Sequence, residues 1–370
     1  MSRGLPVDSK PVLAVLTTAD PHKMFAGNRA NFRDILNVGR EMGFLSYVVT
    51  TRDLRLSEER VMGFTYSPDL KQWQQDIFPL PNVIYNRIPL REDERRPSVR
   101  RKIEECLSHP AIHLYNPSFF NKWQLFGWLK DSHITRPFVP ETKRLRGRKS
   151  LMIMMDQFHS LYLKPESGKA GKGIMRLRFN YKDIRPYKLT ISSPGKNQVY
   201  KTAMLSRLWK RLYRETEGTD YIVQQGIELC KYRGRHFDLR VLVQKTGKGQ
   251  WAVTGIGARL AGPLRITTHV PQGGSVEDPE KMLLPTFGLE ETTFLLSRVK
   301  ANAIMIAKQI ERASGKTHGE MSMDLGVDSS GKLWFFEANA KPMKFDEPHI
   351  RKKSLERIFQ FSQYLAKQSK

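Results

Sequence analysis

The feature that most constrains the fold is a segment near the C-terminus whose pattern is typical of a β-hairpin. Two apolar-rich runs, residues 321–324 and 334–339, flank the sequence Asp-Ser-Ser-Gly at residues 328–331. Such residues favour tight turns, because Gly permits left-handed backbone and Asp or Ser side chains bond to nearby amides. Since side chains alternate faces along a strand, Phe335, Glu337 and Asn339 are expected on one face.

The hairpin register decides whether Asp324 joins that face. If Ser329 and Ser330 form a two-residue loop, Asp324 faces Phe335 and is a diagonal neighbour of Glu337, about 7–8 Å away. Asp324, Glu337 and Asn339 would then offer oxygen ligands of the kind that Mg²⁺ prefers. An ordinary hairpin with solvated acids fits this segment equally well, so both interpretations stay open at this point.

Composition indicates a globular protein with more than one folding unit. The chain has 370 residues, 39% of them hydrophobic and 27% charged, which suits two or more domains. No stretch approaches the length of a membrane span, and the first residues have no signal-peptide core. Cys106 and Cys230 lack metal-ligand spacing and fit a reducing interior. We therefore expect a cytoplasmic protein without a membrane span.

A formal net charge of +25 is the strongest global signal. Such an excess attracts polyanions, including nucleotide phosphates and acidic polymers. The charge gathers in segments 91–102, 143–149, 207–214 and 351–353. These segments carry no nucleic-acid-binding signature, so nucleic acid is not an expected partner. The alternative is that each patch is a solvated face that keeps the protein in solution.

The first third of the chain predicts a small α/β domain. Apolar runs at residues 11–18 and 44–50 flank a helical pattern at 28–42, which is typical of a parallel βαβ unit. Further strands are expected at 82–85 and 112–115, with a basic helix over 98–107 between them. We place the boundary of this N-terminal domain at residues 1–118.

The rest of the chain predicts a second α/β region. Helices are expected at residues 120–130, 199–213, 292–313 and 349–367, the last closing the chain. Strands are expected at 160–164, 173–179, 221–225, 237–244 and 251–260, before the hairpin.

A glycine- and lysine-rich loop follows Lys164, which ends an apolar strand. Its members that could cradle phosphates are Gly168, Lys169, Gly171, Lys172 and Gly173. The loop is not a Walker loop, because Ile174 stands where the lysine belongs. Taken alone it also fits a surface turn, and Lys164 fits a lysine that extends from a strand end to solvent.

The order of these motifs resembles the ATP-grasp superfamily and, within it, the YheC/YheD family of endospore coat-associated proteins. A helix-opening Lys122, Lys164 with its loop, an apolar strand ending in Gln224-Gln225 and the Asp324…Glu337-x-Asn339 hairpin occur in that order. The resemblance implies a small N-terminal α/β domain followed by a two-subdomain ATP-grasp fold. The implied divisions are 119–345 with a lid subdomain at about 136–225, and a helix at 346–370 packing on the ATP-grasp domain.

The resemblance also implies a role for each matching residue. Lys122, Lys164 and the loop would contact the phosphates, and Gln224, Gln225 and Ile227 would line the adenine slot. Asp238 would face the ribose, and Arg240 and Arg259 would serve catalysis. Asp324, Glu337 and Asn339 would hold two Mg²⁺ ions, with Mn²⁺ as an alternative. For Asp238 and Arg240, a cross-strand ion pair remains an alternative role. Ser322 departs from D-alanine ligase-like members, which place an arginine there.

The function that the resemblance implies is ATP- and Mg²⁺-dependent ligation of a carboxylate to an amine. The reaction would pass through an acyl phosphate, on an acidic peptide or other anionic substrate in sporulation. The alternative is a non-catalytic nucleotide-binding protein of the spore coat, with coat proteins as partners. The resemblance implies that either would act in a bacterial cell, in the mother-cell compartment or the spore coat.

Overall fold

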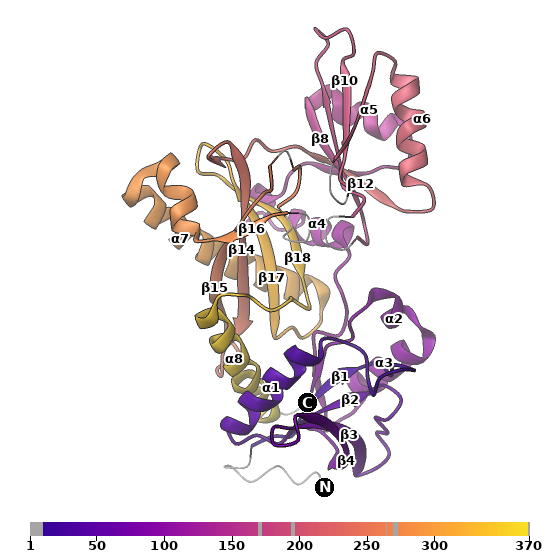
Figure 1. Ribbon diagram of the computed structural model, residues 1–370, viewed down its shortest axis with the longest axis vertical. Coiled ribbons are helices and arrows are strands. Elements are labelled where there is room, and N and C mark those ends of the chain that lie inside the picture. Colours follow the sequence, from indigo (N-terminus) through magenta and orange to yellow (C-terminus); the bar gives the residue numbers. More distant parts are fainter. Residues whose placement is uncertain (1–9, 169–171, 194–196, 264, 269–272, 369–370) are drawn as a thin grey trace.

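The computed structural model describes residues 10–168, 172–193, 197–263, 265–268 and 273–368, and it contains three β-sheets that follow one another along the chain (Figure 1). The expected positions Lys169 and Gly171 lie outside the described residues. Among the described residues, none of the helices combines the length and apolar character that crossing a membrane requires.

The first sheet contains the parallel βαβ unit that the sequence predicts. Strand β1 (Leu13–Thr17) pairs in parallel with β2 (Ser46–Thr50) after helix α1 (Arg29–Glu41). The sheet order is β4-β3-β2-β1-β5-β6. The remaining elements of this unit are β3 (Arg60–Ser67), β4 (Gln72–Pro79), β5 (Val83–Asn86), α2 (Arg91–Arg95), α3 (Pro97–Ser108) and β6 (His113–Tyr115). The β3–β4 hairpin was not predicted, because its exposed edge strands alternate too irregularly.

The second sheet is antiparallel and has helices on one face only. Its order is β11-β10-β9-β8-β12-β7. Apolar side chains of its strands share one core with helices α5 (Arg148–Gln157) and α6 (Leu205–Thr216). The strands are β7 (Thr142–Arg144), β8 (Ser160–Pro165), β9 (Met175–Phe179), β10 (Tyr187–Ile191), β11 (Gln198–Thr202) and β12 (Tyr221–Gln225).

The third sheet holds the hairpin, and two helices cover its apolar face. Its order is β16-β15-β14-β17-β18, with β13 beside β14. Helices α4 (Lys122–Lys130) and α7 (Pro279–Ser314) pack on that face. A short 3-10 turn, η1 (Arg136–Phe138), follows α4. The strands are β13 (Lys231–Tyr232), β14 (Arg235–Lys245), β15 (Trp251–Leu260), β16 (Ser275–Glu277), β17 (Glu320–Val327) and β18 (Leu333–Asn339).

Two predicted helices differ at their N-terminal ends. Residues 198–202 form β11, not the start of a helix, because Val199 and Tyr200 favour strand and pair with β10. Helix α7 begins at Pro279, thirteen residues before the expected start at residue 292. The Asp278 side chain caps this end by accepting from the Lys281 amide. Gly288, with a φ of +75°, interrupts the helical geometry between the two starts.

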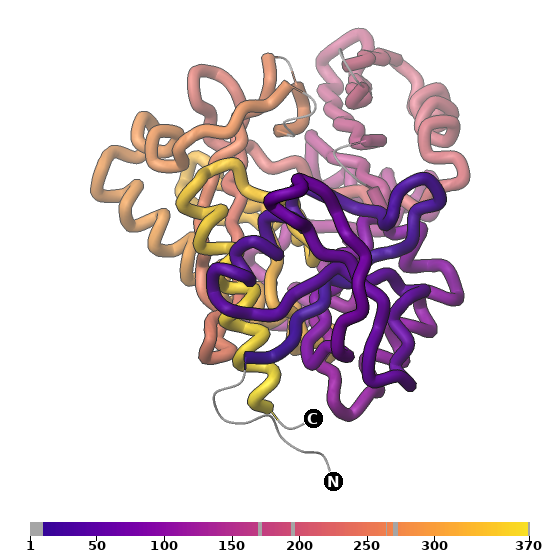
Figure 2. Tube along the Cα trace, turned by 60° about the horizontal axis from the view of Figure 1, so that its bottom comes forward, coloured from indigo at the N-terminus to yellow at the C-terminus, as the bar shows by residue number. Residues whose placement is uncertain are grey.

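The C-terminal helix α8 (Pro348–Ala366) bridges the first and third sheets. The helix lies beside α1 (Figure 2). Its residues Leu355, Phe359 and Phe361 belong to the core of the first sheet. On its other side Arg357 donates to the Ala252 carbonyl and the Thr254 hydroxyl of β15, at 3.2 and 2.7 Å. The helix therefore fastens the N-terminal unit to the sheet that carries the hairpin.

Candidate functional site

The hairpin brings Asp324 and Glu337 directly opposite one another. Strands β17 and β18 are antiparallel, with Asp324 paired to Glu337 and Ser322 paired to Asn339. The loop is one residue longer than expected, because the Asp328 amide bonds to the Lys332 carbonyl at 3.1 Å. Gly331, with a φ of +77°, supplies the left-handed position that this longer loop requires. The predicted two-residue loop is therefore wrong.

A β-bulge compensates for this error. The register shifts between Asp324 and Leu325, so β18 contains one extra residue. Two displacements of one residue together equal the two-residue period of a strand, and Asp324 and Glu337 stay on one face. They become direct partners, closer than the predicted diagonal neighbours. Phe335 does not share that face, contrary to prediction: it is fully buried in the core beneath the sheet.

Each carboxylate of the pair already contacts a cation. The Lys122 ammonium lies 2.9 Å from Glu337 Oε1, and Arg259 Nη2 lies 2.6 Å from Asp324 Oδ2. Arg259 also forms two hydrogen bonds to Asp238, at 2.9 and 3.0 Å. Burial would lower the pKa of Arg259, but Asp238 and Asp324 raise it above its ordinary value. The guanidinium thus stays charged between two acids.

Lys164 faces this pair from the second sheet. Its ammonium donates to Gln224 Oε1 at 2.7 Å and lies 5.3 Å from the Phe336 ring centre, on β18. Burial lowers the pKa of Lys164 to about 8, and the carboxylate of Glu337 opposes that shift. The alternative that Lys164 extends from the strand end to solvent is therefore wrong. Lys164 is a half-buried cation that faces the acidic hairpin.

The two glutamines lie at the end of β12, and both side chains form hydrogen bonds within the second sheet or to the residues before it. Gln224 lies opposite both Thr142 and Tyr162, so its backbone lies inside the sheet. Its side chain bridges Lys164 and the Thr142 hydroxyl, the latter at 2.9 Å. Gln225 Oε1 accepts from the Glu141 amide at 3.2 Å. The chain leaves the sheet only after these residues, at Gly226 and Ile227.

Arg240 lies on β14, opposite Asp324, and makes no ion pair with any carboxylate among the described residues. It donates weakly to the Met343 carbonyl, at 3.4 Å, and its guanidinium lies over the Phe345 ring. Burial lowers its pKa, and the charge of Asp324 opposes this. Asp238 pairs with Arg259 of the neighbouring strand β15, so the alternative of a cross-strand ion pair is confirmed for Asp238 and not for Arg240.

The described part of the glycine-rich loop is anchored at both ends. Gly173 has a φ of +72°, and its carbonyl accepts from the Tyr221 hydroxyl at 3.0 Å. At the other end, Glu166 pairs with Arg144 at 2.8 Å. Gly168 and Lys172 lie between these anchors, where a loop joins β8 to β9.

Sequence reasoning missed Lys341 and Arg91. Lys341 is almost fully buried, forms an ion pair with Glu94 of α2, and donates to Asn86 Oδ1 at 2.9 Å. Arg91, also on α2, has a pKa lowered by burial, an effect that Glu337 opposes. The only available signal was a lysine set between Ala340 and Pro342. Nothing local in residues 91–95 indicated that this segment approaches the hairpin.

The donor set fits a magnesium ion that is shared with phosphates. Among the described residues, no group of three or more His, Cys, Asp or Glu side chains could hold a metal. Asp324 and Glu337 supply two carboxylates, with Asn339 two positions beyond Glu337 on the same strand. Magnesium in nucleotide sites is commonly held by one or two carboxylates together with substrate phosphates. The residues present therefore fit that arrangement and do not fit a cage made by protein alone.

Comparison with known sequences places most of the chain in one family. Residues 111–365 match the family described as YheC/D like ATP-grasp. The endospore coat-associated protein YheD of Bacillus subtilis (strain 168) is 25% identical over 368 residues, covering 97% of this chain and 80% of that protein. YheC of the same organism is 20% identical over 303 residues, covering 82% of each.

Solved structures share the fold. The ATP-grasp ligase PsnB, complexed with a phosphomimetic variant of its minimal precursor, Mg and ADP, aligns with a TM-score of 0.53 and 13% identity, over 98% of this chain and 100% of PsnB. The VanG D-Ala:D-Ser ligase from Enterococcus faecalis gives 0.53 and 13%, over 96% and 100%. At such identities the likeness establishes the fold alone, and it confirms the predicted ATP-grasp architecture.

Proposed function

The chain belongs to the YheC/D-like ATP-grasp family, and from that premise we propose that it is an ATP- and Mg²⁺-dependent carboxylate–amine ligase. The observation that carries the proposal is that Asp324 and Glu337 lie opposite one another among three cations from three elements: the buried Lys122 of α4 and Arg259 of β15, and the half-buried Lys164 of β8. Two acids among three cations make a site whose charge suits a metal–polyphosphate complex.

Each residue has a task that follows from its position. Lys122 and Lys164 contact the phosphates, with Gly168, Lys172 and Gly173 closing over them from the second sheet. Asp324, Glu337 and Asn339 hold two Mg²⁺ ions, and the same oxygen ligands also suit Mn²⁺. Bound metal supplies positive charge that neutralises the phosphate oxygens during transfer. Arg240, which has no carboxylate partner among the described residues, meets the anionic acyl group.

The reaction proceeds in two steps. A carboxylate oxygen attacks the γ-phosphorus of ATP, the bond to the bridging oxygen breaks, and ADP leaves. The amine nitrogen then attacks the carbonyl carbon of the acyl phosphate, inorganic phosphate leaves with the C–O electron pair, and the nitrogen loses a proton. The protein contributes position and charge, which are the main sources of catalysis in phosphoryl transfer.

The remaining assignments belong to the same proposal. Gln225 and Ile227, where the chain leaves β12, border the adenine, while Gln224 holds Lys164 in place. Asp238, anchored by Arg259, lies toward the ribose. We keep the divisions at residues 1–118, 119–345 with a lid at about 136–225, and 346–370, and the order of the three sheets and the closing helix along the chain supports them. The excess positive charge suits an acidic peptide or another anionic substrate.

A second candidate function is nucleotide binding without catalysis, in a protein associated with the spore coat. The names of the YheD and YheC relatives favour it, since both are called endospore coat-associated proteins. Ser322 also favours it, because this position has no arginine and its buried hydroxyl makes no hydrogen bond among the described residues. Arg259 can take the place of the missing arginine, because its guanidinium already contacts Asp324 from β15.

Release of ADP tests the proposal. With Mg²⁺, ATP and a panel of acidic peptides and amines, we expect ADP release that depends on both an acid and an amine. Glu337→Gln should lower the rate on the order of a hundredfold, because the metal–phosphate complex loses a charged ligand. Glu290→Gln, an exposed change on α7, is the matched control and should leave the rate unchanged. Tight ATP binding without turnover for any pair would instead support the non-catalytic function.

A further inference from the structure

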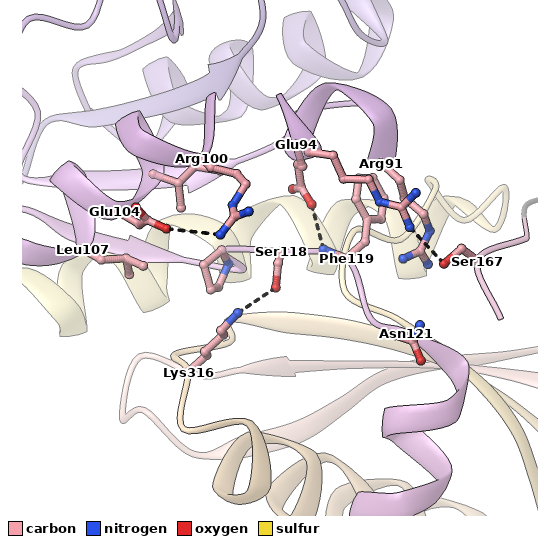
Figure 3. Close-up of a pocket in the computed structure, with 13 residues that line it drawn as sticks. Arg91, Glu94, Arg100, Glu104, Leu107, Ser118, Phe119, Asn121, Ser167 and Lys316 are labelled. Carbon is pink, nitrogen blue, oxygen red and sulfur yellow. Dashed lines mark hydrogen bonds and ion pairs between the residues drawn. The ribbon is translucent and has the colours of Figure 1, made fainter. Parts of the chain in front are cut away.

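A cavity of about 500 Å³ lies beside the candidate site, between the N-terminal unit and the third sheet (Figure 3). Its walls come from α2, α3, the linker at residues 117–121, Ser167 at the start of the glycine-rich loop, and Lys316 just after α7. Its volume is typical of a ligand pocket.

The side chains that line the cavity carry a net positive charge, and its carboxylates are already paired with cations. Four cationic side chains line it, Arg91, Arg95, Arg100 and Lys316, against two carboxylates. Both carboxylates are already engaged. Glu94 is paired with the buried Lys341 and accepts from the Phe119 amide at 3.0 Å, and Glu104 lies 3.9 Å from Arg100.

The other three cations are held by uncharged groups. Arg95 donates to the Ser167 hydroxyl at 3.2 Å, and Lys316 donates to the Ser118 hydroxyl at 3.1 Å. The Arg91 guanidinium lies 4.9 Å from the Phe119 ring centre. Among the described residues, none of the three has a carboxylate at ion-pair distance. Neutral partners orient these side chains without neutralising them, so an anionic ligand would gain charge-assisted hydrogen bonds.

The cations occupy two ends of the cavity. Figure 3 shows Arg100 and Lys316 toward one end and Arg91 and Ser167 toward the other, with Phe119 between them. Ile103, Leu107 and Pro117 add apolar wall. Two positive ends joined by an apolar floor fit a ligand with two separated carboxylates on a partly apolar chain.

The cavity is connected to the candidate site at two points. Ser167 belongs to the loop that we place over the phosphates, and Glu94 is fixed by Lys341, two residues beyond Asn339. The position of α2 is thus tied to the hairpin. Building on the proposed ligase function, we propose that this cavity binds consecutive acidic residues of a peptide, and that this acidic peptide is the anionic substrate.

Binding of tri-glutamate to the full-length protein tests the proposal. The double variant Arg95→Ala/Lys316→Ala removes one cation from each end, and its affinity for tri-glutamate should fall by about tenfold or more. Both side chains are exposed enough for the variant to fold. The matched control Arg185→Ala/Lys300→Ala removes the same charge from exposed positions outside the cavity, and should change the affinity less than about twofold.

The competing outcomes are distinct. Equal weakening in both double variants would show nonspecific attraction to a basic surface and would overturn the proposal. Free glutamate or inorganic phosphate binding as tightly as tri-glutamate would overturn the peptide assignment. ATP affinity should be retained in Arg95→Ala/Lys316→Ala, and the KM for an acidic peptide should rise with little change in kcat. If no acid–amine pair supports ADP release but tri-glutamate binding still depends on the cavity, only the ligase function fails.

Discussion

Side chains of the hairpin alternate between its two faces with a period of two residues. For this reason the sequence correctly predicted that Asp324 and Glu337 share a face, although the predicted register was wrong. The predicted loop was one residue too short, and the bulge beside Asp324 was invisible in the sequence. Bulges arise from how a strand meets its partners, so no local residue pattern announces them. Asp324 and Glu337 still share a face because the longer loop and the bulge each displace the register by one residue, and together these displacements equal the two-residue period of a strand. Phe335 lies between the loop and the bulge, so it is displaced by only one residue and takes the opposite face.

At the residue scale, nucleotide affinity should depend on the protonation of Lys164. Its pKa is lowered to about 8 by burial, and only the ammonium form attracts phosphate. We expect ATP affinity to fall on the order of tenfold as pH rises through that value, measured by calorimetry at constant ionic strength. Lys164→Arg stays charged throughout and should give a flatter profile. An identical profile for both proteins would contradict the assignment.

Stability without nucleotide should follow the opposite trend. The lysine has a pKa of about 8 in the folded chain and 10.5 as its ordinary value. Between these values the unfolded chain binds more protons, so the contribution of Lys164 to folding stability rises with pH. Opposite pH trends in ATP affinity and in folding stability, both absent in Lys164→Arg, would therefore identify Lys164 as the source of both.

At the element scale, the second sheet carries a row of like charges on the face that lacks helices. Lys188 of β10 lies directly opposite Arg178 of β9 and Lys201 of β11. All three side chains are exposed, and none forms an ion pair with a carboxylate among the described residues. Cross-strand like charges destabilise a sheet, so this row lowers the stability of the subdomain.

Replacing the central lysine should stabilise the subdomain. Lys188→Glu converts two repulsive pairs into two attractive ones, worth about 1 kcal/mol together. Slower hydrogen exchange of the β9–β11 amides at low salt would reveal it, and the gain should shrink as salt screens the charges. Lys182→Glu makes the same charge change in the β9–β10 turn and should have a smaller effect. Equal effects of both variants would mean that only net charge matters.

Helices and strands could be predicted where the local sequence carries a clear apolar pattern. Strong apolar periodicity located α1, α4 and the long strands of the third sheet, whereas α7 was cut short because Gly288 interrupts its pattern. Segment 198–202 alternates like a strand yet directly precedes a helix, and without its partner β10 its pairing could not be seen. The edges of each element depend on neighbours that the sequence does not reveal.

At the scale of the whole molecule, contacts between distant segments decide how the units are joined, and these were the hardest to predict. Glu320 of β17 is buried against the N-terminal unit, 3.2 Å from Arg87 and bonded to the Tyr85 hydroxyl of β5. Gln244 of β14 donates to its other oxygen at 3.1 Å. Nothing near residue 320 indicates a partner more than two hundred positions earlier. The same holds for Lys341 and Glu94.

This buried network should hold the N-terminal unit to the third sheet. Glu320→Gln keeps the shape but removes the charge that compensates Arg87, which should cost about 3–5 kcal/mol because a buried cation is left unpaired. Arg55 and Glu58 form an ion pair at the same 3.2 Å distance on the surface, with side chains 72% and 52% exposed, against 10% and 6% for Arg87 and Glu320. Glu58→Gln should therefore cost less than about 1 kcal/mol. In thermal unfolding we expect Glu320→Gln to lower the first transition and to separate the N-terminal unit from the rest. An unchanged single transition would mean that α8, which spans both units, holds them together without the network.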